Sequence, residues 1–175
     1  MAIWQFGVIL IPKSAISSEG EALPASIPME MTDHLWWSEQ QPPQGFEKQI
    51  DLILSRSKSW SEQMQIWGGE SGNDAQVCYT DGEKKVVEEI AFWLDARNIS
   101  LDLIRMICTL AAQLSCVLLT ADSKVLQPVE SEMLAAIRNS TATKFVDDPV
   151  ATLGSKIVTL RVKRSQDTPT GEEKS

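Results

Sequence analysis

Residues 86–120 read VVEEIAFWLDARNISLDLIRMICTLAAQLSCVLLT, and the order of elements within them indicates the fold class. Over residues 86–94, apolar side chains recur at every second position, which is the period of a strand with one buried face. The residues expected on that face are Ile90, Phe92 and Leu94. The adjacent acids Glu88 and Glu89 indicate that one end of this strand is exposed to solvent.

A helix follows this strand and is the clearest element of the sequence. Ser100 is a suitable N-cap, because its hydroxyl can accept a hydrogen bond from a free backbone N–H of the first turn. Asp102 places negative charge at the positive end of the helix dipole. The apolar positions are Leu103, Ile104, Ile107, Leu110, Ala111 and Leu114. They predict a helix over residues 101–114 that packs on a sheet, and residues 116–120 predict a short buried strand after it.

Hairpins are expected on both sides of this helix. Asp81-Gly82 is a strong turn signal, since a tight hairpin turn needs a positive φ, which glycine accepts. It predicts a hairpin near residues 75–94, and the turn at residues 121–123 predicts a second hairpin near 116–127. The remaining regular elements expected are a strand over residues 3–11 and helices over 46–56 and 129–139.

Hairpins interleaved with single helices predict an α+β fold, with an antiparallel or mixed sheet and helices packed mainly on one face. We expect a single domain over residues 1–163. Within it, residues 14–45 are expected to be largely irregular, because they hold four prolines and show little periodicity. The less regular segments are predicted to be a short helix at 31–36, a strand or docked extension at 144–146, a strand at 157–162 and a disordered tail at 164–175.

The composition disfavours several classes of protein. The chain has 175 residues and a net charge of −8, whereas nonspecific nucleic-acid binding needs a basic face. No apolar run reaches the roughly 18 residues of a membrane-spanning helix, and residues 1–6 lack the features of a signal peptide. Cys78, Cys108 and Cys116 lack the spacing of a disulfide scaffold or a zinc site. A cytoplasmic protein with neither a nucleic-acid nor a membrane partner is the expectation.

No motif for catalysis or for a cofactor is recognisable. Residues 68–72 are rich in glycine, but they lack the lysine of a phosphate-binding loop and precede a predicted strand rather than a helix. His34 is the single imidazole, whereas catalytic zinc sites more often use two or three. We therefore expect no cofactor and no metal. An enzyme of unknown class that uses His34 with nearby carboxylates stays an alternative.

Tryptophan and acidic residues are concentrated in the first part of the chain. Residues 19–102 hold 16 acidic and 6 basic side chains, a net charge of −10. Aromatic side chains beside acids are typical of protein interfaces. We therefore predict four contact residues for a partner: Trp36, Trp37, Glu70 and Asp74. Two other interpretations are that the tryptophans anchor the irregular segment to the core and that the acids only keep the chain soluble.

The order of features along the chain carries a resemblance. The features are Trp36-Trp37 before Pro42-Pro43, Ser59-Trp60-Ser61 before Ile66-Trp67-Gly68, Gly72-Asn73-Asp74, and Leu94-Asp95-Ala96-Arg97 before a helix. Across residues 3–150, this order resembles small uncharacterised bacterial cytosolic proteins, some of which look like immunity proteins of polymorphic toxin systems. The resemblance implies an α+β cytoplasmic protein that binds and blocks a toxin domain without catalysis of its own.

The expected function is therefore that of a non-enzymatic protein-binding module. Its acidic part would contact a basic partner, as in an immunity-type inhibitor that neutralises a toxin. Besides the enzyme, a structural or self-associating module is the other alternative, since exposed sheet edges and tryptophan side chains also suit a homodimer.

Overall fold

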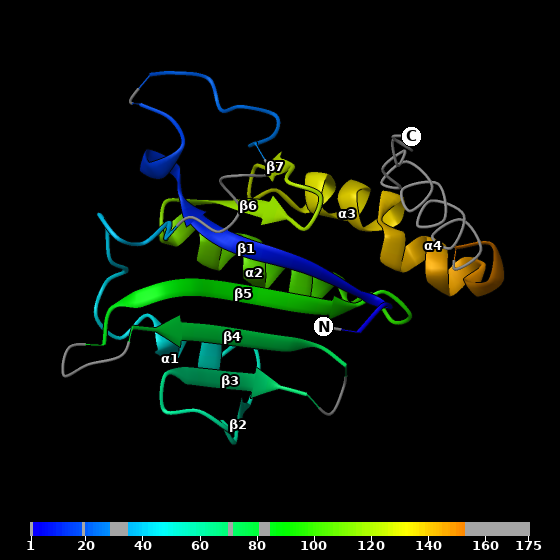
Figure 1. Cartoon of the computed structure of the whole chain (residues 1–175), viewed down its shortest axis with the longest axis horizontal. Helices are drawn as coiled ribbons and strands as arrows, with labels where there is room; N and C mark the ends of the chain where they lie inside the picture. The colour runs from blue at the N-terminus through cyan, green and yellow to red at the C-terminus, as the bar shows by residue number, and fades with distance from the viewer. Residues whose placement is uncertain (1, 19, 29–34, 70–71, 81–84, 153–175) are drawn as a thin grey trace, which may run out of the picture.

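The alternating stretch around Ile90 forms strand β5 near the centre of the sheet in the computed structural model of the protein (Figure 1). The structure describes residues 2–18, 20–28, 35–69, 72–80 and 85–152. These residues contribute seven strands: β1 (Gln5–Pro12), β2 (Arg56–Ser57), β3 (Met64–Gly68), β4 (Asp74–Tyr79), β5 (Val87–Asp95), β6 (Cys116–Thr120) and β7 (Val125–Leu126). The helical elements are the 3-10 turn η1 (Lys13–Ala15) and the helices α1 (Glu47–Asp51), α2 (Leu101–Gln113), α3 (Glu130–Asn139) and α4 (Thr141–Asp147). The predicted α+β fold is confirmed.

All neighbouring strands run antiparallel, in the order β2-β3-β4-β5-β1-β6-β7. The first strand lies in the middle: Ile9 pairs with Ala91 of β5 on one side and with Leu119 of β6 on the other. The edge strands β2 and β7 have two residues each. Backbone contacts from Ala25 and Ser26 also line β7, since the Ala25 carbonyl accepts a hydrogen bond from the Val125 N–H at 3.0 Å. Short or covered edges offer few free backbone groups to another chain.

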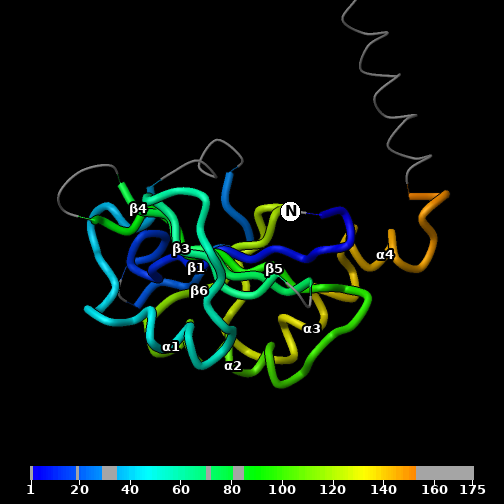
Figure 2. The backbone as a smooth tube through the Cα atoms, turned by 90° about the horizontal axis from the view of Figure 1, so that it is seen from below, coloured from blue at the N-terminus to red at the C-terminus, as the bar shows by residue number. Residues whose placement is uncertain are grey.

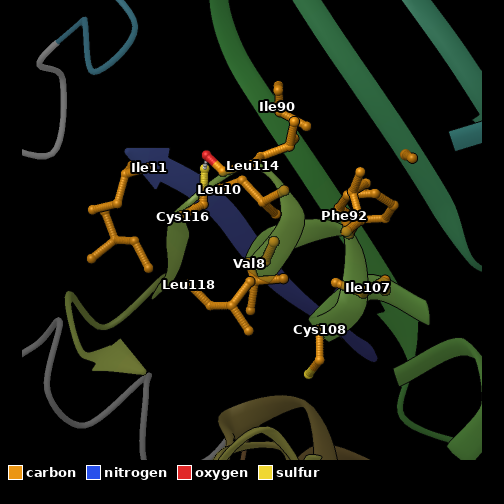
Figure 3. Packing of buried hydrophobic residues seen from close by; sticks show 14 of the residues in the cluster. Val8, Leu10, Ile11, Ile90, Phe92, Ile107, Cys108, Leu114, Cys116 and Leu118 are labelled. Carbon is orange, nitrogen blue, oxygen red and sulfur yellow. Dashed lines mark hydrogen bonds between the residues drawn. The ribbon is translucent and has the colours of Figure 1, made fainter. Parts of the chain in front are cut away.

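Helix α2 forms much of the layer that buries one face of the sheet. It begins as predicted, with the Ser100 hydroxyl accepting a hydrogen bond from the Leu103 N–H at 3.3 Å. All six predicted apolar positions of this helix are buried. In Figure 3, Ile107 lies near Val8 of β1 and Phe92 of β5. Figure 2 shows α1, α2 and α3 on the same side of the sheet, so the prediction of helices mainly on one face is also confirmed.

Both predicted hairpins are present. Strands β4 and β5 pair from Asp74 opposite Trp93 to Tyr79 opposite Val87, with a register shift between Cys78 and Tyr79. Their predicted turn at Asp81-Gly82 lies outside the described residues. Strands β6 and β7 form the second hairpin. In its turn, Ser123 adopts a φ of 63°, which is the left-handed conformation that tight turns often use.

The helix predicted over residues 46–56 is shorter in the structure, where α1 covers only Glu47–Asp51. Phe46 and Ile50 of the predicted apolar stripe are buried as expected, whereas Leu52 is 81% exposed. Arg56 and Ser57 pair with β3 instead of extending the helix. Strand pairing with a distant part of the chain therefore overrides the local helical pattern.

Residues 144–146, predicted as a strand or a docked extension, belong to helix α4. The reason is the cap before them: the Ser140 hydroxyl accepts a hydrogen bond from the Thr143 N–H at 3.1 Å. Residues 14–45 are largely irregular where they are described, as expected. Most of the helix predicted at 31–36, the strand at 157–162 and the tail at 164–175 lie outside the described residues.

Candidate functional site

The strand register sorts the side chains of the sheet onto two faces. Directly paired residues of antiparallel strands point to the same side. Phe92 pairs with Val8, and both side chains belong to the core on the side of α2. The next residue, Trp93, points to the other side together with its pairing partners, Asp74 of β4 and Gly7 of β1. The sheet therefore has a second face, which is turned away from α1, α2 and α3.

We name one region of this second face the open face. It is formed by β3, β4, β5 and the middle of β1, and it consists of Ile9, Met64, Ile66, Asp74, Gln76, Cys78, Glu88, Glu89, Ala91 and Trp93. Figure 1 is viewed onto this face, with α2 lying behind β1 and β5. None of the helices that the structure describes crosses in front of β3, β4 or β5.

Apolar side chains surround Gln76 and Ala91, which lie in the middle of the open face. The half-buried ones are Ile9, Met64, Ile66, Cys78 and Trp93. By contrast, Val77, Ile90 and Phe92 on the opposite face of the same strands are fully buried. Because Gly7 has no side chain, β1 supplies nothing to pack on the Trp93 ring at the directly paired position. Partly exposed apolar residues that gather on one surface are typical of a contact site for another molecule.

Two carboxylates lie beside these apolar side chains. Glu89 pairs with Cys78, and Glu88 is the extra residue at the register shift between β4 and β5. Burial raises the pKa of Glu89. Burial, together with the negative charges of Glu89 and Glu88, raises the pKa of the Cys78 thiol to about 11. Among the ion pairs of the described residues, none includes either acid. A partly desolvated carboxylate without a basic neighbour is a favourable contact for a lysine or an arginine.

Asp74, one of the predicted contact residues, lies on the open face at the first position of β4. Its Oδ2 accepts a hydrogen bond from Nε2 of Gln5 at 2.7 Å, and the same amide donates to the Gly72 carbonyl at 2.9 Å. Asp74 is half-buried, so part of its carboxylate is still accessible to solvent. It adds a third negative charge to the open face.

The two predicted tryptophans lie in the core and not on the surface. Trp36 and Trp37 are 4% and 1% exposed, and the indole N–H of Trp37 donates to the Leu10 carbonyl at 3.0 Å. A partner cannot contact rings that are buried to this extent. The two rings anchor the irregular segment to the sheet, which is the other interpretation that the sequence offers. The fourth predicted contact residue, Glu70, lies outside the described residues.

A charged corner adjoins the open face at the end of β5. The carboxylate of Asp95 is buried, and it accepts hydrogen bonds from Nε and Nη2 of Arg97 at 2.8 and 2.7 Å, which lower the pKa of Asp95. The Arg97 guanidinium also lies 4.7 Å from the centre of the Trp4 ring. Gly72 is needed here, because its φ is 78° and a Cβ would lie 2.6 Å from Oδ2 of Asp95. Asp95, Arg97 and Trp4 thus bind one another through hydrogen bonds and a cation–π contact, so the corner has a structural role.

Catalytic chemistry finds little support in the described part of the chain. It contains no group of three His, Cys, Asp or Glu side chains able to hold a metal ion. Burial raises the pKa of Cys108 to about 11 and that of Cys116 to about 12, so both thiols stay protonated at neutral pH. A cavity of about 340 Å³ lies between the start of β1, the turn after β6 and the α3–α4 junction, and there Asp122 pairs with Lys124 at 2.6 Å. His34 lies outside the described residues.

Sequence reasoning identifies Asp74 but misses most of the open face. It indicates only that Glu88 and Glu89 mark an exposed strand end. The missing signal is present in the same alternation that predicts the core positions of β5. The residues between those positions include Glu89, Ala91 and Trp93, and they share the other face.

Comparison of the chain with protein-family models, with curated proteins and with solved structures finds no match. Within the described residues, no helix has the length and apolar character that crossing a membrane requires. The function must therefore be inferred from the chemistry of the open face.

Proposed function

We propose that this protein is a non-enzymatic binding module that holds a basic protein partner on its open face. One observation carries the proposal. Half-buried apolar side chains surround Gln76 on this face, no described helix covers it, and the bordering acids Glu88 and Glu89 form no ion pair with any described residue. Such a surface offers both apolar area and charge to a second molecule.

Trp93 is the residue expected to contribute most to binding. Its indole is a large, rigid apolar surface with few rotamers, and tryptophan is enriched among residues whose removal weakens protein complexes by about 2 kcal/mol or more. Ile9 and Ile66 lie on the same face in the next row of paired residues. Apolar side chains of a partner would complete the burial of all three, which supplies the affinity.

The acids of the open face select the charge of the partner. A lysine or arginine placed beside Glu89 would offset the desolvation that raises the pKa of this carboxyl group. Negative charge on the face also speeds the approach of a basic protein, and this effect weakens as salt is added. The resemblance to immunity proteins implies a partner of this kind, since many toxin domains that act on nucleic acids are basic.

Self-association explains these features less well. The edge strands β2 and β7 are two residues long, so they give little backbone for edge-to-edge pairing of two copies. A symmetric dimer through the open face would bring Glu88 and Glu89 of one copy toward the same acids of the other. Like charges in contact are costly, whereas a basic partner removes the repulsion.

Photo-cross-linking in the native host tests the proposal. A photoreactive amino acid replaces Gln76 in the middle of the open face or, as the matched control, Thr109 on the exposed side of α2. We expect a basic protein to be cross-linked at high yield from position 76 and not from position 109, with mass spectrometry identifying it. The same proteins captured from both positions, or a partner captured only from position 109, would overturn the proposal.

A further inference from the structure

We propose that residues 156–164 dock on the open face of their own chain and so compete with the protein partner for it. The inference rests on the proposed function, because it adds a regulator to the same site. Its basis is the match between the sequence of this segment and the side chains of the open face.

The segment reads KIVTLRVKR, with four basic residues and no acidic one. Its apolar and polar residues alternate from Val158 onward. In an extended chain, Val158, Leu160 and Val162 would share one side with Lys156 and Arg164, whereas Thr159, Arg161 and Lys163 would lie on the other. The side that carries the aliphatic residues is therefore apolar in its middle and basic at both ends.

The open face offers complementary partners to this side of the chain. Trp93, Ile9 and Ile66 form a half-buried apolar surface for the three aliphatic side chains. The carboxylates of Glu88 and Glu89 lack an ion pair within the described part of the chain, and the basic side chains could supply one. Opposite charges beside a shared apolar contact favour one docking surface over the rest of the molecule.

The path of the chain is compatible with this docking. Helix α4 contacts β1, the strand that carries Ile9. In Figure 2, the orange end of the described chain lies on the side of the sheet away from α1, α2 and α3, which is the side of the open face. The docking segment ends 12 residues after Thr152, and 12 residues span up to about 40 Å when fully extended. This exceeds the roughly 30 Å length of a nine-residue strand such as β5.

A tether makes even a weak contact competitive. Segments joined by a short flexible linker meet at effective concentrations of about millimolar, so the docked segment would displace a weakly bound protein but yield to a tightly bound one. The segment would thus set a threshold of affinity that a partner must exceed. High salt would weaken both the docked segment and a basic partner.

Disulfide trapping in the full-length chain tests the docking. Cys78 is a native, half-buried thiol of the open face, whereas Cys108 and Cys116 are buried. A second thiol is introduced with Leu160→Cys or, as the control, with Thr170→Cys, which lies in the same terminal stretch outside the docking segment. Oxidised glutathione is the oxidant; each disulfide that forms removes two electrons and two protons from the pair of thiols and yields two reduced glutathiones.

We expect L160C to form an intramolecular disulfide with Cys78 at least about ten times faster than T170C does, because docking raises the local concentration of the thiol. The triple change R161Q/K163Q/R164Q in the L160C chain should lower this rate, and it should speed association of the chain with the partner captured from position 76. Equal rates for L160C and T170C, or a rate insensitive to the triple change, would overturn the docking.

The result separates this inference from the proposed function, since trapping is measured on the chain alone. A disulfide from L160C with no partner captured at position 76 would overturn the proposed function and leave the docking in place. A partner captured there without preferential trapping would overturn the docking alone.

Discussion

Phe92 and Trp93 are neighbours in β5, but their side chains lie on opposite faces of the sheet. Phe92 is fully buried on the side of α2, whereas Trp93 is half-buried on the open face. The helix-covered face uses its apolar side chains to stabilise the fold, and its strands carry few charges there. The open face retains apolar area and carries Glu88 and Glu89, which form no ion pair within the described part of the chain. Two aromatic residues in one strand therefore serve stability and, in our proposal, recognition.

The largest expected difference between the two faces concerns these two residues. We expect Phe92→Ala to lower the free energy of unfolding by about 3–5 kcal/mol, because it leaves a cavity in a closely packed core. Trp93→Ala should cost less than about 2 kcal/mol, because its ring is only partly removed from water. Urea denaturation of both variants measures the difference. Equal losses would show that the two faces are buried alike and would break the comparison.

An isoleucine pair sharpens the same comparison without aromatic residues. Ile107 of α2 is fully buried, and Ile66 of β3 is half-buried on the open face. We expect Ile107→Ala to cost about 2–5 kcal/mol and Ile66→Ala about 1 kcal/mol or less, again by urea denaturation. A cost below about 0.5 kcal/mol for Ile107→Ala would contradict the burial of this side chain between α2 and the sheet.

The charged corner predicts how stability depends on pH. The hydrogen bonds from Arg97 lower the pKa of Asp95 below its unfolded value of about 3.9. The ionised carboxylate therefore stabilises the folded protein above about pH 4, and this contribution is lost as the pH falls through the lowered pKa. We expect Asp95→Asn to cost about 1–3 kcal/mol at pH 7 and less at acid pH.

A matched control for this variant is Asp102→Asn. The Asp102 carboxylate pairs with Arg105 at 3.0 Å, but its side chain is 84% exposed. An exposed ion pair contributes less than about 1 kcal/mol, so the control should hardly change stability at any pH. The measurement is the free energy of unfolding across a pH series, and a flat difference between wild type and Asp95→Asn would contradict the prediction.

Glu89 on the open face should show the opposite and smaller pH dependence. Burial raises its pKa above the unfolded value of about 4.3, so ionisation opposes folding. The contribution of the neutral carboxyl group to stability is fully present below that value. This contribution is lost as the pH rises through the raised pKa. We expect Glu89→Gln to stabilise the protein by up to about 1 kcal/mol at pH 7, as replacements at functional sites often do.

At about pH 3 the Glu89→Gln change should have no effect on stability, because the carboxyl group is then protonated in both the folded and the unfolded state. Thermal unfolding at the two pH values measures this, and a destabilised variant at pH 7 would be the contrary result.

The sequence predicts those parts of the fold whose signals are local. Ser100 and the apolar stripe of α2 lie within 15 residues, and the alternation in β5 is equally short-range, so both elements are predicted correctly. The length of α1 is predicted wrongly, because Arg56 and Ser57 pair with β3 instead of extending the helix. Tertiary contacts decide pairing of this kind. The placement of β1 between β5 and β6 likewise joins residues that lie between 82 and 112 positions apart in the sequence.

The candidate site is harder to predict than the fold for the same reason. Asp74 is predicted from charge, and although it lies on the open face, its contact with a partner stays a prediction. Trp36 and Trp37 are predicted as contacts from their acidic neighbours but are buried, because residues 35–41 pack at the end of the sheet. Ile9 and Ile66 look like core residues in the sequence. In the structure both are half-buried, on the face of the sheet turned away from α1, α2 and α3.

The claim that the open face binds a basic partner is tested most directly by two pairs of charge reversals. Glu88→Lys with Glu89→Lys changes the open face, whereas Asp102→Lys with Glu130→Lys makes the same change in net charge on the opposite side, where both acids pair with Arg105. The measurement is the association rate with the partner captured from position 76, at low and high salt. We predict that the open-face pair slows association by about tenfold or more at low salt and that the difference shrinks at high salt, while the control pair has little effect. Equal slowing by both pairs, or by neither, would contradict the account.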